Sequence, residues 1–445
     1  MKFNNMTNIT FRLKILATLI LIVLSIVFSE LSMATIKLQG IIKDSQTKEV
    51  LVYASLGLKK YPIGTCSNQN GEFQLVVADS LSNETLNVSY VGYESKEYTI
   101  KEMDTNYFEI LLEPKPIQLA EVSVLPQITA EEVLKNVIKK HTRNFPFGFC
   151  FYEAFFRDLV RNDSPEAVDK SKIYRMTEAA INIEDFGLDS YRDPKFKVHE
   201  IRNSFNYVES SKYKYFESIG GIQSPVSWIY RSINRVSMYN LKKLLKDDCY
   251  SKEIIGLTEF DGTPVYILEL REKYLKFLGI KILDLTNGGY NRDILYVNAK
   301  NWAIQEAKHL FVGKDSLSCL FKTELKMQEF EGKYYLKLLE YDGIILDEYG
   351  KLDKDHFYRH KASILVNDIV LERRSIERIR RRNAMKTDLP LWNVEYTYNP
   401  EFWSTYNILL DKPIDPSVKK DLEQEVPLDN QFNDGGLKNS KKTVN

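Results

Sequence analysis

The stretch NGEFQLVV, residues 70–77, decides the fold of the first part of this chain. Asn-Gly is a strong short-range turn signal, because both residues tolerate the positive φ angles of tight turns. The residues that follow alternate between apolar and polar, which places Phe73 and Leu75 on one face of a strand. We therefore predict a turn at Asn70-Gly71 that leads into a strand with one buried face.

The same pattern of short alternating runs and turn residues extends from Ile36 to about Val124. The runs are IKLQGIIKD (36–44), VLVYASLGLK (50–59), GEFQLVV (71–77), TLNVSYVGY (85–93), KEYTI (96–100) and YFEILLE (107–113). Several short strands with frequent turn signals are typical of a small β-sandwich. We therefore predict a sandwich over residues 35–124.

The motifs of this region carry a family resemblance. They are Gly40, Asp44, Val52-Tyr53-Ala54-Ser55, Gly64-Thr65, Asn70-Gly71-Glu72-Phe73, Val88-Ser89-Tyr90-Val91-Gly92-Tyr93 and Leu119-Ala120-Glu121-Val122-Ser123-Val124. Over residues 36–124 their order resembles the carboxypeptidase-like regulatory domain found in envelope proteins of Bacteroidetes-type bacteria, often ahead of TonB-dependent receptor barrels. The resemblance implies a transthyretin-like sandwich without the zinc ligands or catalytic glutamate of the peptidase, so peptidase activity is not implied.

One part of the sequence departs from the family pattern. Asn68, Gln69 and Asn70 stand in the turn where acidic residues are usual. If this turn binds an ion or a partner in some relatives, we do not expect that site in this chain.

The first 34 residues predict the compartment. Arg12 and Lys14 precede an apolar run from Ile15 to Phe28, and Ser32-Met33-Ala34 supplies the small residues of a cleavage site. This pattern predicts a secretory signal over residues 1–34. An uncleaved anchor is the alternative, although the run is shorter than the roughly 20 residues of a membrane-spanning helix. No Cys follows the run, so we expect an exported protein, periplasmic or associated with the outer membrane, that is not a lipoprotein and has no transmembrane span in the mature chain.

The chain has 61 basic and 61 acidic residues among 445, with 44% hydrophobic residues. This composition is globular, and its balanced charge gives no long-range field to hold a polyanion. We therefore expect no nucleic-acid partner. The sequence does not determine an oligomeric state.

The rest of the chain divides into three predicted parts. Residues 125–145 form a linker and a helix, in which Thr129 and Glu132 have the spacing of a capping box. Residues 146–411 form a larger α+β domain with a mostly antiparallel sheet. Residues 412–445 are polar and rich in Gly and Asn, which predicts a disordered tail. The fold class is mainly β.

Successive hairpins in the larger domain predict an antiparallel meander with one helix. The predicted strands are 253–260, 263–270, 293–298, 303–311, 321–330, 334–339, 362–373 and 392–398, and the predicted helix is 239–246. This half shows a weaker resemblance to two envelope families. They are the half-barrel of periplasmic lipoprotein carriers and the soluble segment behind the regulatory domain in some outer-membrane proteins.

We assign no catalytic, cofactor-binding or metal-binding residues from the sequence. It lacks GxSxG, SxxK, GxGxxG and Walker A motifs. His356 and His360, with Asp353 and Asp355 nearby, have metal-ligand spacing for a helix, but the neighbouring residues favour a strand or a loop. The acidic stretch from Asp347 to Asp355 lacks the spacing of a calcium loop, so we expect a solvated loop.

Three further features have two interpretations each. The run from Arg373 to Arg382 holds six arginines, which fit either anionic lipid or polysaccharide headgroups or a charged strand edge with local ion pairs. The rings of Phe145, Phe147, Phe149 and Phe151 alternate onto one face of a strand, as core or as an apolar groove. The four cysteines are expected to be buried thiols, with a Cys249–Cys319 disulfide as the alternative.

These observations favour a non-enzymatic exported envelope protein that acts in binding or assembly, with an envelope protein, a glycan or a lipid as partner. A carrier of an apolar ligand is the second hypothesis, and it requires an apolar cavity in the larger domain. A hydrolase with an unrecognised site is the third.

Overall fold

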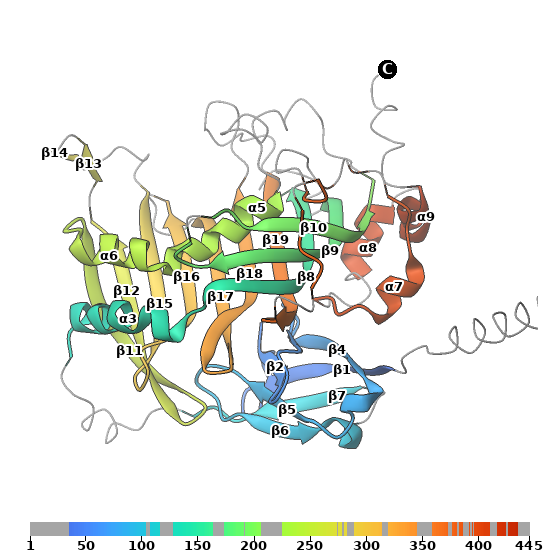
Figure 1. Ribbon diagram of the computed structural model, residues 1–445, viewed down its shortest axis with the longest axis horizontal. Helices are drawn as coiled ribbons and strands as arrows, with labels where there is room; N and C mark the ends of the chain where they lie inside the picture. Colours follow the sequence, from blue (N-terminus) through green and yellow to red (C-terminus); the bar gives the residue numbers. More distant parts are fainter. Residues whose placement is uncertain are drawn as a thin grey trace, which may run out of the picture.

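The computed structural model is mainly β, as predicted, with a small sandwich, a large sheet and helices along one face of that sheet (Figure 1). It describes residues 35–103, 107–115, 128–162, 173–190, 192–205, 225–273, 275–277, 280–282, 289–313, 319–344, 358–372, 376–380, 382–385, 391, 394, 396–409, 416–423 and 426–434. The predicted signal lies outside the described residues. Within them, no helix is both long and apolar enough to cross a membrane.

The sandwich consists of two sheets around one apolar core. Their strands are β1 (Thr35–Asp44), β2 (Ser55–Leu58), β3 (Gly64–Cys66), β4 (Glu72–Ala78), β5 (Thr85–Ser89), β6 (Lys96–Thr99) and β7 (Phe108–Leu112), with short 3-10 turns η1 (Asp79–Leu81) and η2 (Ile100–Glu102). One sheet has the order β4-β1-β7 and the other β3-β2-β5-β6. Phe73 and Leu75 are fully buried between them, as the alternation predicts.

The Asn70-Gly71 turn passes the chain from one sheet to the other. Gly71 has a φ of 74°, in the left-handed region that favours glycine. The Asn68 side-chain oxygen accepts hydrogen bonds from the backbone N–H groups of Asn70 and Glu72, both at 2.8 Å. An Asn in place of the family's acidic residue therefore keeps the structural role of the turn without the charge.

The larger domain is built on a ten-stranded antiparallel sheet with the order β10-β9-β8-β19-β18-β17-β16-β15-β12-β11. The strands are β8 (Phe147–Asn162), β9 (Ile173–Gly187), β10 (Lys195–Asn203), β11 (Tyr250–Phe260), β12 (Thr263–Glu272), β15 (Tyr290–Asn298), β16 (Ile304–Val312), β17 (Cys319–Phe330), β18 (Lys333–Ile344) and β19 (Tyr358–Val370), and a separate hairpin comprises β13 (Leu275–Phe277) and β14 (Ile280–Ile282). The predicted hairpin turn at Asp261-Gly262 joins β11 to β12.

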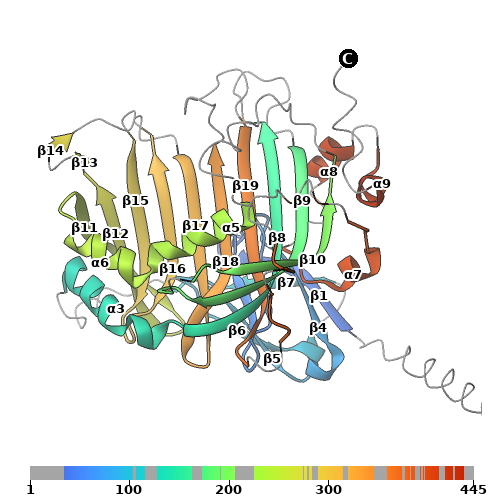
Figure 2. The same ribbon diagram turned by 45° about the horizontal axis from the view of Figure 1, so that its top comes forward.

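Helices cover one face of this sheet. They are α3 (Ala130–Asn144), α5 (Pro225–Tyr230), the 3-10 helix η3 (Arg231–Val236) and α6 (Met238–Lys246), and Figure 2 shows them crossing the strands. The predicted capping box begins α3, because the Thr129 hydroxyl accepts from the Glu132 N–H and the Glu132 side chain accepts from Thr129. Alternate strand residues such as Phe156 and Ile364 pack with these helices in one continuous apolar core.

The opposite face of the sheet contacts the sandwich and α7 (Pro400–Thr405). A second apolar cluster joins Tyr53 and Cys66 of the sandwich to Phe155, Leu365 and Trp403. Lys337 lies in the same contact and is almost fully buried, with its ammonium donating to the Val366 carbonyl at 2.8 Å. One face of the sheet is therefore covered by helices, and the other is covered by the sandwich and α7.

Two of the sequence predictions in the C-terminal part are wrong. The described residues between 394 and 398 form no strand, although residues 392–398 alternate. The predicted disordered tail contains α8 (Pro416–Glu423) and α9 (Leu428–Asn433), in which Leu422 and Phe432 are buried against Met176. Those few apolar side chains pack on the sheet and order the two helices. The polar average composition of residues 412–445 therefore misled the prediction.

The aromatic run is also divided differently from its prediction. Phe145 ends α3 and is buried, whereas Phe147 is 77% exposed. Gly148 has a φ of 115°, and the register of β8 shifts between Phe147 and Cys150. This irregularity breaks the alternation, so the four rings do not share a face.

Gly40→Ala tests the close packing of the sandwich. A Cβ at Gly40 would lie 2.0 Å from the Phe108 carbonyl oxygen, which is backbone and cannot move away easily. We expect a loss of about 2 to 4 kcal/mol of unfolding free energy, measured by urea denaturation. Gly57→Ala is the matched control, because its nearest atom would be 3.9 Å away. Equal losses in both variants would contradict this packing.

Lys337→Met tests the buried ammonium. Burial lowers the pKa of Lys337 to about 8, from an ordinary value of 10.5. Below the folded-state pKa the buried charge therefore costs stability, and this cost of up to about 3 kcal/mol is relieved as the pH rises from 8 to 10.5. We expect wild type to gain stability relative to Lys337→Met over this range, measured by denaturation at each pH. A pH-independent difference would refute the prediction.

Candidate binding cleft between the sandwich and the sheet

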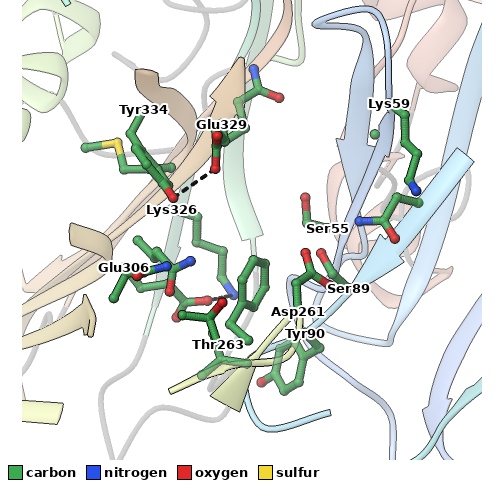
Figure 3. A pocket seen from close by; sticks show the side chains of 18 of the residues that line it. Ser55, Lys59, Ser89, Tyr90, Asp261, Thr263, Glu306, Lys326, Glu329 and Tyr334 are labelled. Carbon is green, nitrogen blue, oxygen red and sulfur yellow. Dashed lines mark hydrogen bonds and ion pairs between the residues drawn. The ribbon is translucent and has the colours of Figure 1, made fainter. Parts of the chain in front are cut away.

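A cleft of about 370 Å³ lies between the sandwich and the sheet (Figure 3). In the close-up, Ser55, Lys59 and Ser89 of the sandwich face Glu306, Lys326 and Tyr334 of the sheet across it. A neighbouring hollow of about 350 Å³ shares Tyr90, Glu306 and Lys326 with this cleft. We call the two together the interdomain cleft.

The sandwich wall follows from the alternation of β2 and β5. Leu56 and Val88 are fully buried in the sandwich core. The residues that alternate with them line the cleft, namely Ser55 and Gly57 of β2 and Asn87 and Ser89 of β5. Ser55 pairs with Ser89 and Gly57 pairs with Asn87 across the two strands. Small polar side chains therefore form a flat wall with hydrogen-bonding groups.

The sheet wall is made of charged residues on three adjacent strands. Glu306 of β16 lies opposite Lys326 of β17, and the ammonium and carboxylate are 2.9 Å apart. The next pair is Lys308 and Glu324, at 3.8 Å. Residues on the other face at this level, such as Leu325, belong to the core under the helices. The wall thus presents alternating acids and bases with little net charge.

Contacts between the two walls fix the middle of the interdomain cleft. The Tyr53 hydroxyl donates to Glu340 Oε2 at 3.1 Å, and Gln69 Nε2 donates to the Tyr53 hydroxyl at 3.3 Å. The Lys326 ammonium lies 5.0 Å from the centre of the Tyr90 ring, within cation–π range. The sandwich is therefore held on the charged wall by polar contacts as well as by the apolar cluster beside it.

Burial and neighbouring charges shift the pKa values of Tyr53 and Lys326. Burial raises the pKa of Tyr53, which keeps the hydroxyl protonated as a donor. For Lys326, burial by itself would lower the pKa, but the Glu306 carboxylate outweighs it and the pKa is raised. At neutral pH the Tyr53 hydroxyl therefore stays protonated and the Lys326 ammonium stays charged, so the wall is a fixed arrangement of charges and donors.

The side-chain oxygen of Gln305, in the lining of the cleft, has no hydrogen-bond partner among the described residues. Gln305 is 6% exposed, and its Oε1 atom accepts no hydrogen bond there. Buried amide oxygens are normally paired, so a donor from a ligand or from solvent would complete this site.

The contact at the far end of the cleft involves the β11–β12 turn. The Gly92 N–H donates to the Glu259 carbonyl at 2.8 Å, and Lys115 pairs with the Glu259 carboxylate at 2.6 Å. Ser95 also hydrogen-bonds Asp261 in the turn. The sandwich is therefore joined to the β11–β12 turn by backbone as well as side-chain contacts.

Of the histidine pair considered from the sequence, His360 alone lies in the described part of the chain. His356, Asp353, Asp355, Asp347 and Glu348 lie outside the described residues.

His360 lies in strand β19, as the neighbouring residues favoured, and not in a helix. Its Nε2 atom is 2.5 Å from Asp158, which also accepts from Arg175 at 2.8 Å. Burial by itself would raise the pKa of Asp158, but the charges of His360 and Arg175 lower it. This group is a buried ion-pair cluster under the helix-covered face.

The arginine run forms no strand in its described part. Arg378 pairs with Glu184 at 3.4 Å, and the Ile379 N–H donates to the same carboxylate at 3.0 Å. Arg380 and Arg382 are exposed, and Arg373, Arg374 and Arg381 lie outside the described residues. The expected strand edge is therefore wrong for the described part, whereas a local ion pair is present.

The cysteines follow the simpler expectation where they are described. Cys66 and Cys150 are buried free thiols, and burial raises the pKa of both. The side chain of Cys319 is not among those that the structure describes, so the Cys249–Cys319 disulfide stays a prediction.

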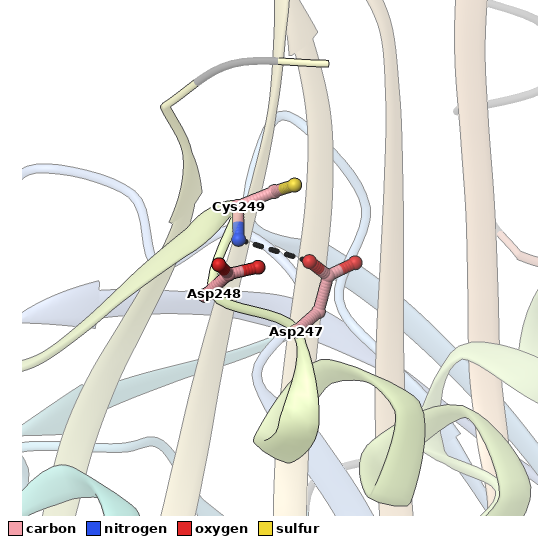
Figure 4. Close-up of side chains that lie close together, drawn as sticks. All are labelled: Asp247, Asp248 and Cys249. Atoms are coloured by element: carbon pink, nitrogen blue, oxygen red, sulfur yellow. Dashed lines mark hydrogen bonds between the residues drawn. The ribbon is translucent and has the colours of Figure 1, made fainter. Parts of the chain in front are cut away.

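Asp247, Asp248 and Cys249 bring three potential ligand atoms within 4.8 Å of one another where α6 ends (Figure 4). The Cys249 N–H donates to Asp247 at 2.9 Å. That hydrogen bond explains the proximity as a turn, and Asp248 is exposed. We assign no metal to it.

Comparison with known proteins confirms the predicted resemblance of the first domain. Residues 38–124 match the family model of the CarboxypepD_reg-like domain. This is about a fifth of the chain. No curated protein matches the sequence significantly.

Solved structures show a weak likeness to the larger part of the chain. A domain from Vibrio parahaemolyticus, assigned to an outer membrane lipoprotein-sorting protein, is 10% identical, covers 55% of this chain and 96% of its own, and has a TM-score of 0.24. A DUF1329 family protein from Desulfovibrio piger is 11% identical, covers 56% and 98%, and has a TM-score of 0.23. A LolA superfamily protein from Nitrosomonas europaea is 11% identical, covers 55% and 94%, and has a TM-score of 0.21. These likenesses match the weak resemblance to half-barrels and carry no conclusion about ligand or activity.

Lys326→Met tests the charged wall. The change leaves the Glu306 carboxylate without its partner in a largely buried site, and we expect a loss of about 3 kcal/mol of unfolding free energy in denaturant titrations. Adding Glu306→Gln should recover most of this loss. Lys322→Met is the control, because the Lys322 side chain is 42% exposed and its ion pair contributes little. A double variant as unstable as Lys326→Met would contradict the pairing.

Proposed function

We propose that the chain is an exported, non-enzymatic binding protein whose ligand site is the interdomain cleft. The observation that supports this most is the cleft itself, which two different domains line with hydroxyl, amide and paired charged groups. Its two hollows have the size of ordinary ligand sites. The signal-like residues 1–34 support export.

The lining favours a polar ligand. Glu306, Lys308, Glu324 and Lys326 present charges of both signs at regular strand spacing. A segment of an envelope protein or a glycan offers donors and acceptors that such a wall can match, whereas an acyl chain would leave these groups desolvated. Recognition by binding or assembly is therefore the function that we favour.

The arrangement of the groups favours binding over catalysis. The Glu306 carboxylate is paired with Lys326, and Glu340 accepts from Tyr53. Their positions are explained by mutual pairing. The hydroxyls next to carboxylates in the described cleft are those of Tyr53 and Tyr334, and no serine or threonine of its lining is hydrogen-bonded to a base. We therefore propose no reaction for this site.

The carrier hypothesis receives no comparable support from the described residues. The sheet face that a half-barrel carrier would use is packed against α3, α5 and α6. Side chains such as Val137, Ile229 and Leu241 are fully buried there. A carrier with an apolar cavity stays a prediction that the described part of the chain does not favour.

Photocrosslinking at Tyr61 tests the proposal. Tyr61 lines the interdomain cleft and is 39% exposed, so p-benzoylphenylalanine at this position would react with a bound ligand in intact cells. Tyr107 is the matched control, because it is 48% exposed and lies outside the lining. We expect one discrete adduct from position 61 and none from position 107. Protease digestion of the adduct then distinguishes a protein from a glycan.

Two outcomes would contradict the proposal. They are the absence of an adduct at position 61 in cells that express the folded protein, and the same adducts from both positions. Ser89→Trp should also abolish the adduct at position 61, because the indole would fill the cleft.

A further inference from the structure

A second cleft, of about 550 Å³, lies on the helix-covered side of the larger domain. It is bounded by the turn after β9, residues 188–190, and by η3 and the start of α6. Its charged and aromatic lining residues are Asp189, Arg231, Arg235, Tyr239 and Lys242. We call it the basic cleft.

The basic cleft has an excess of cations in a chain of balanced charge. Arg231, Arg235 and Lys242 line it, against the single carboxylate of Asp189. That carboxylate is already engaged, because it accepts from the Met238 N–H at 2.8 Å and lies 3.1 Å from buried His141. Arg231 has an ion pair with Asp193, an acid that is 83% exposed and gives a weak, exchangeable contact.

The most exposed aromatic side chains of the described residues lie beside this cleft. Tyr239 is 80% exposed and lines it, and Phe147 is 77% exposed. The backbone of Phe147 pairs with Gly187, which is followed by Leu188 of the lining. The other large exposed apolar or aromatic side chains of the described part are at most 48% exposed.

The exposure of Phe147 is built into the backbone. Gly148 adopts a φ of 115°, a backbone conformation that residues other than glycine rarely adopt. The register shift that follows turns Phe147 outward while Phe151 stays buried. An apolar ring held in water at such a position costs free energy, which a contact surface would recover.

We propose that the basic cleft and its two aromatic side chains dock the protein on the surface of an anionic lipid bilayer. Arg231, Arg235 and Lys242 would pair with phosphate headgroups, and the rings of Phe147 and Tyr239 would enter the interface. Cations beside exposed aromatic rings are the combination that membrane interfaces select. A free phosphate would use the cations alone and would leave the rings in water.

This surface is separate from the interdomain cleft. The basic cleft lies among the helices, whereas the sandwich contacts the opposite face of the sheet (Figures 1 and 2). Docking would therefore leave the interdomain cleft accessible, and either proposal can fail without the other.

Vesicle sedimentation tests the docking surface. The mature chain is mixed with vesicles of phosphatidylcholine alone or with vesicles in which phosphatidylglycerol replaces part of it. We expect binding to the anionic vesicles only, weakened by added salt because the attraction is screened. Arg235→Gln with Lys242→Gln should lower the affinity about tenfold or more, since two of the three cations that attract the anionic surface are lost.

A second pair of variants isolates the rings. Phe147→Ser with Tyr239→Ser should also lower vesicle affinity at least about fivefold. Tyr107→Ser with Ile255→Ser, at exposed positions outside both clefts, should not change it. All four side chains are partly or largely exposed, so thermal unfolding should show folded variants.

Three results would overturn the proposal. The first is equal binding, or none, to the two kinds of vesicle. The second is unchanged affinity in both the cation and the ring variants. The third is displacement of the protein from vesicles by inorganic phosphate at constant ionic strength with no effect of the ring variants, which would indicate a free-anion site.

Discussion

The pairing of β8 with β19 is the constraint on which the rest of the structure depends. It joins Phe151 to Val370 and Asn162 to Tyr358, so that the first strand of the larger domain lies beside its last. Without it, the β8–β9–β10 hairpins and the meander from β11 to β19 would be two separate sheets. Closing a loop of about two hundred residues costs entropy, which is recovered only when both faces of the joined sheet are buried.

The two faces of the joined sheet are covered by chemically different partners. Helices α3, α5 and α6 bring an apolar stripe to one face, and its core is continuous across the strands. The sandwich meets the other face partly through apolar contacts around Phe155 and partly through charged groups such as Lys326. This difference places the dry core under the helices and the polar cleft under the sandwich.

Alternation along single strands connects these layers. On β17, Leu325 faces the helices while Lys326 faces the interdomain cleft. On β2, Leu56 faces the sandwich core while Ser55 faces the same cleft. One set of alternate residues on such a strand packs in a core, and the other set lines the interdomain cleft. The cleft is therefore lined by the same strands that form the two cores.

The sequence by itself determined the local features. The Asn70-Gly71 turn, the capping box of Thr129 and Glu132, the Asp261-Gly262 hairpin and the sandwich motifs all depend on backbone angles and hydrogen bonds within a few residues. Only the tertiary structure decided the pairing of β8 with β19, the helices of the C-terminal part and the residues that line each cleft. Strands buried on both faces, such as β9, lose the alternation that would reveal their faces. Many antiparallel strand pairings are similar in local preference. Which strands pair is therefore determined by contacts between distant segments.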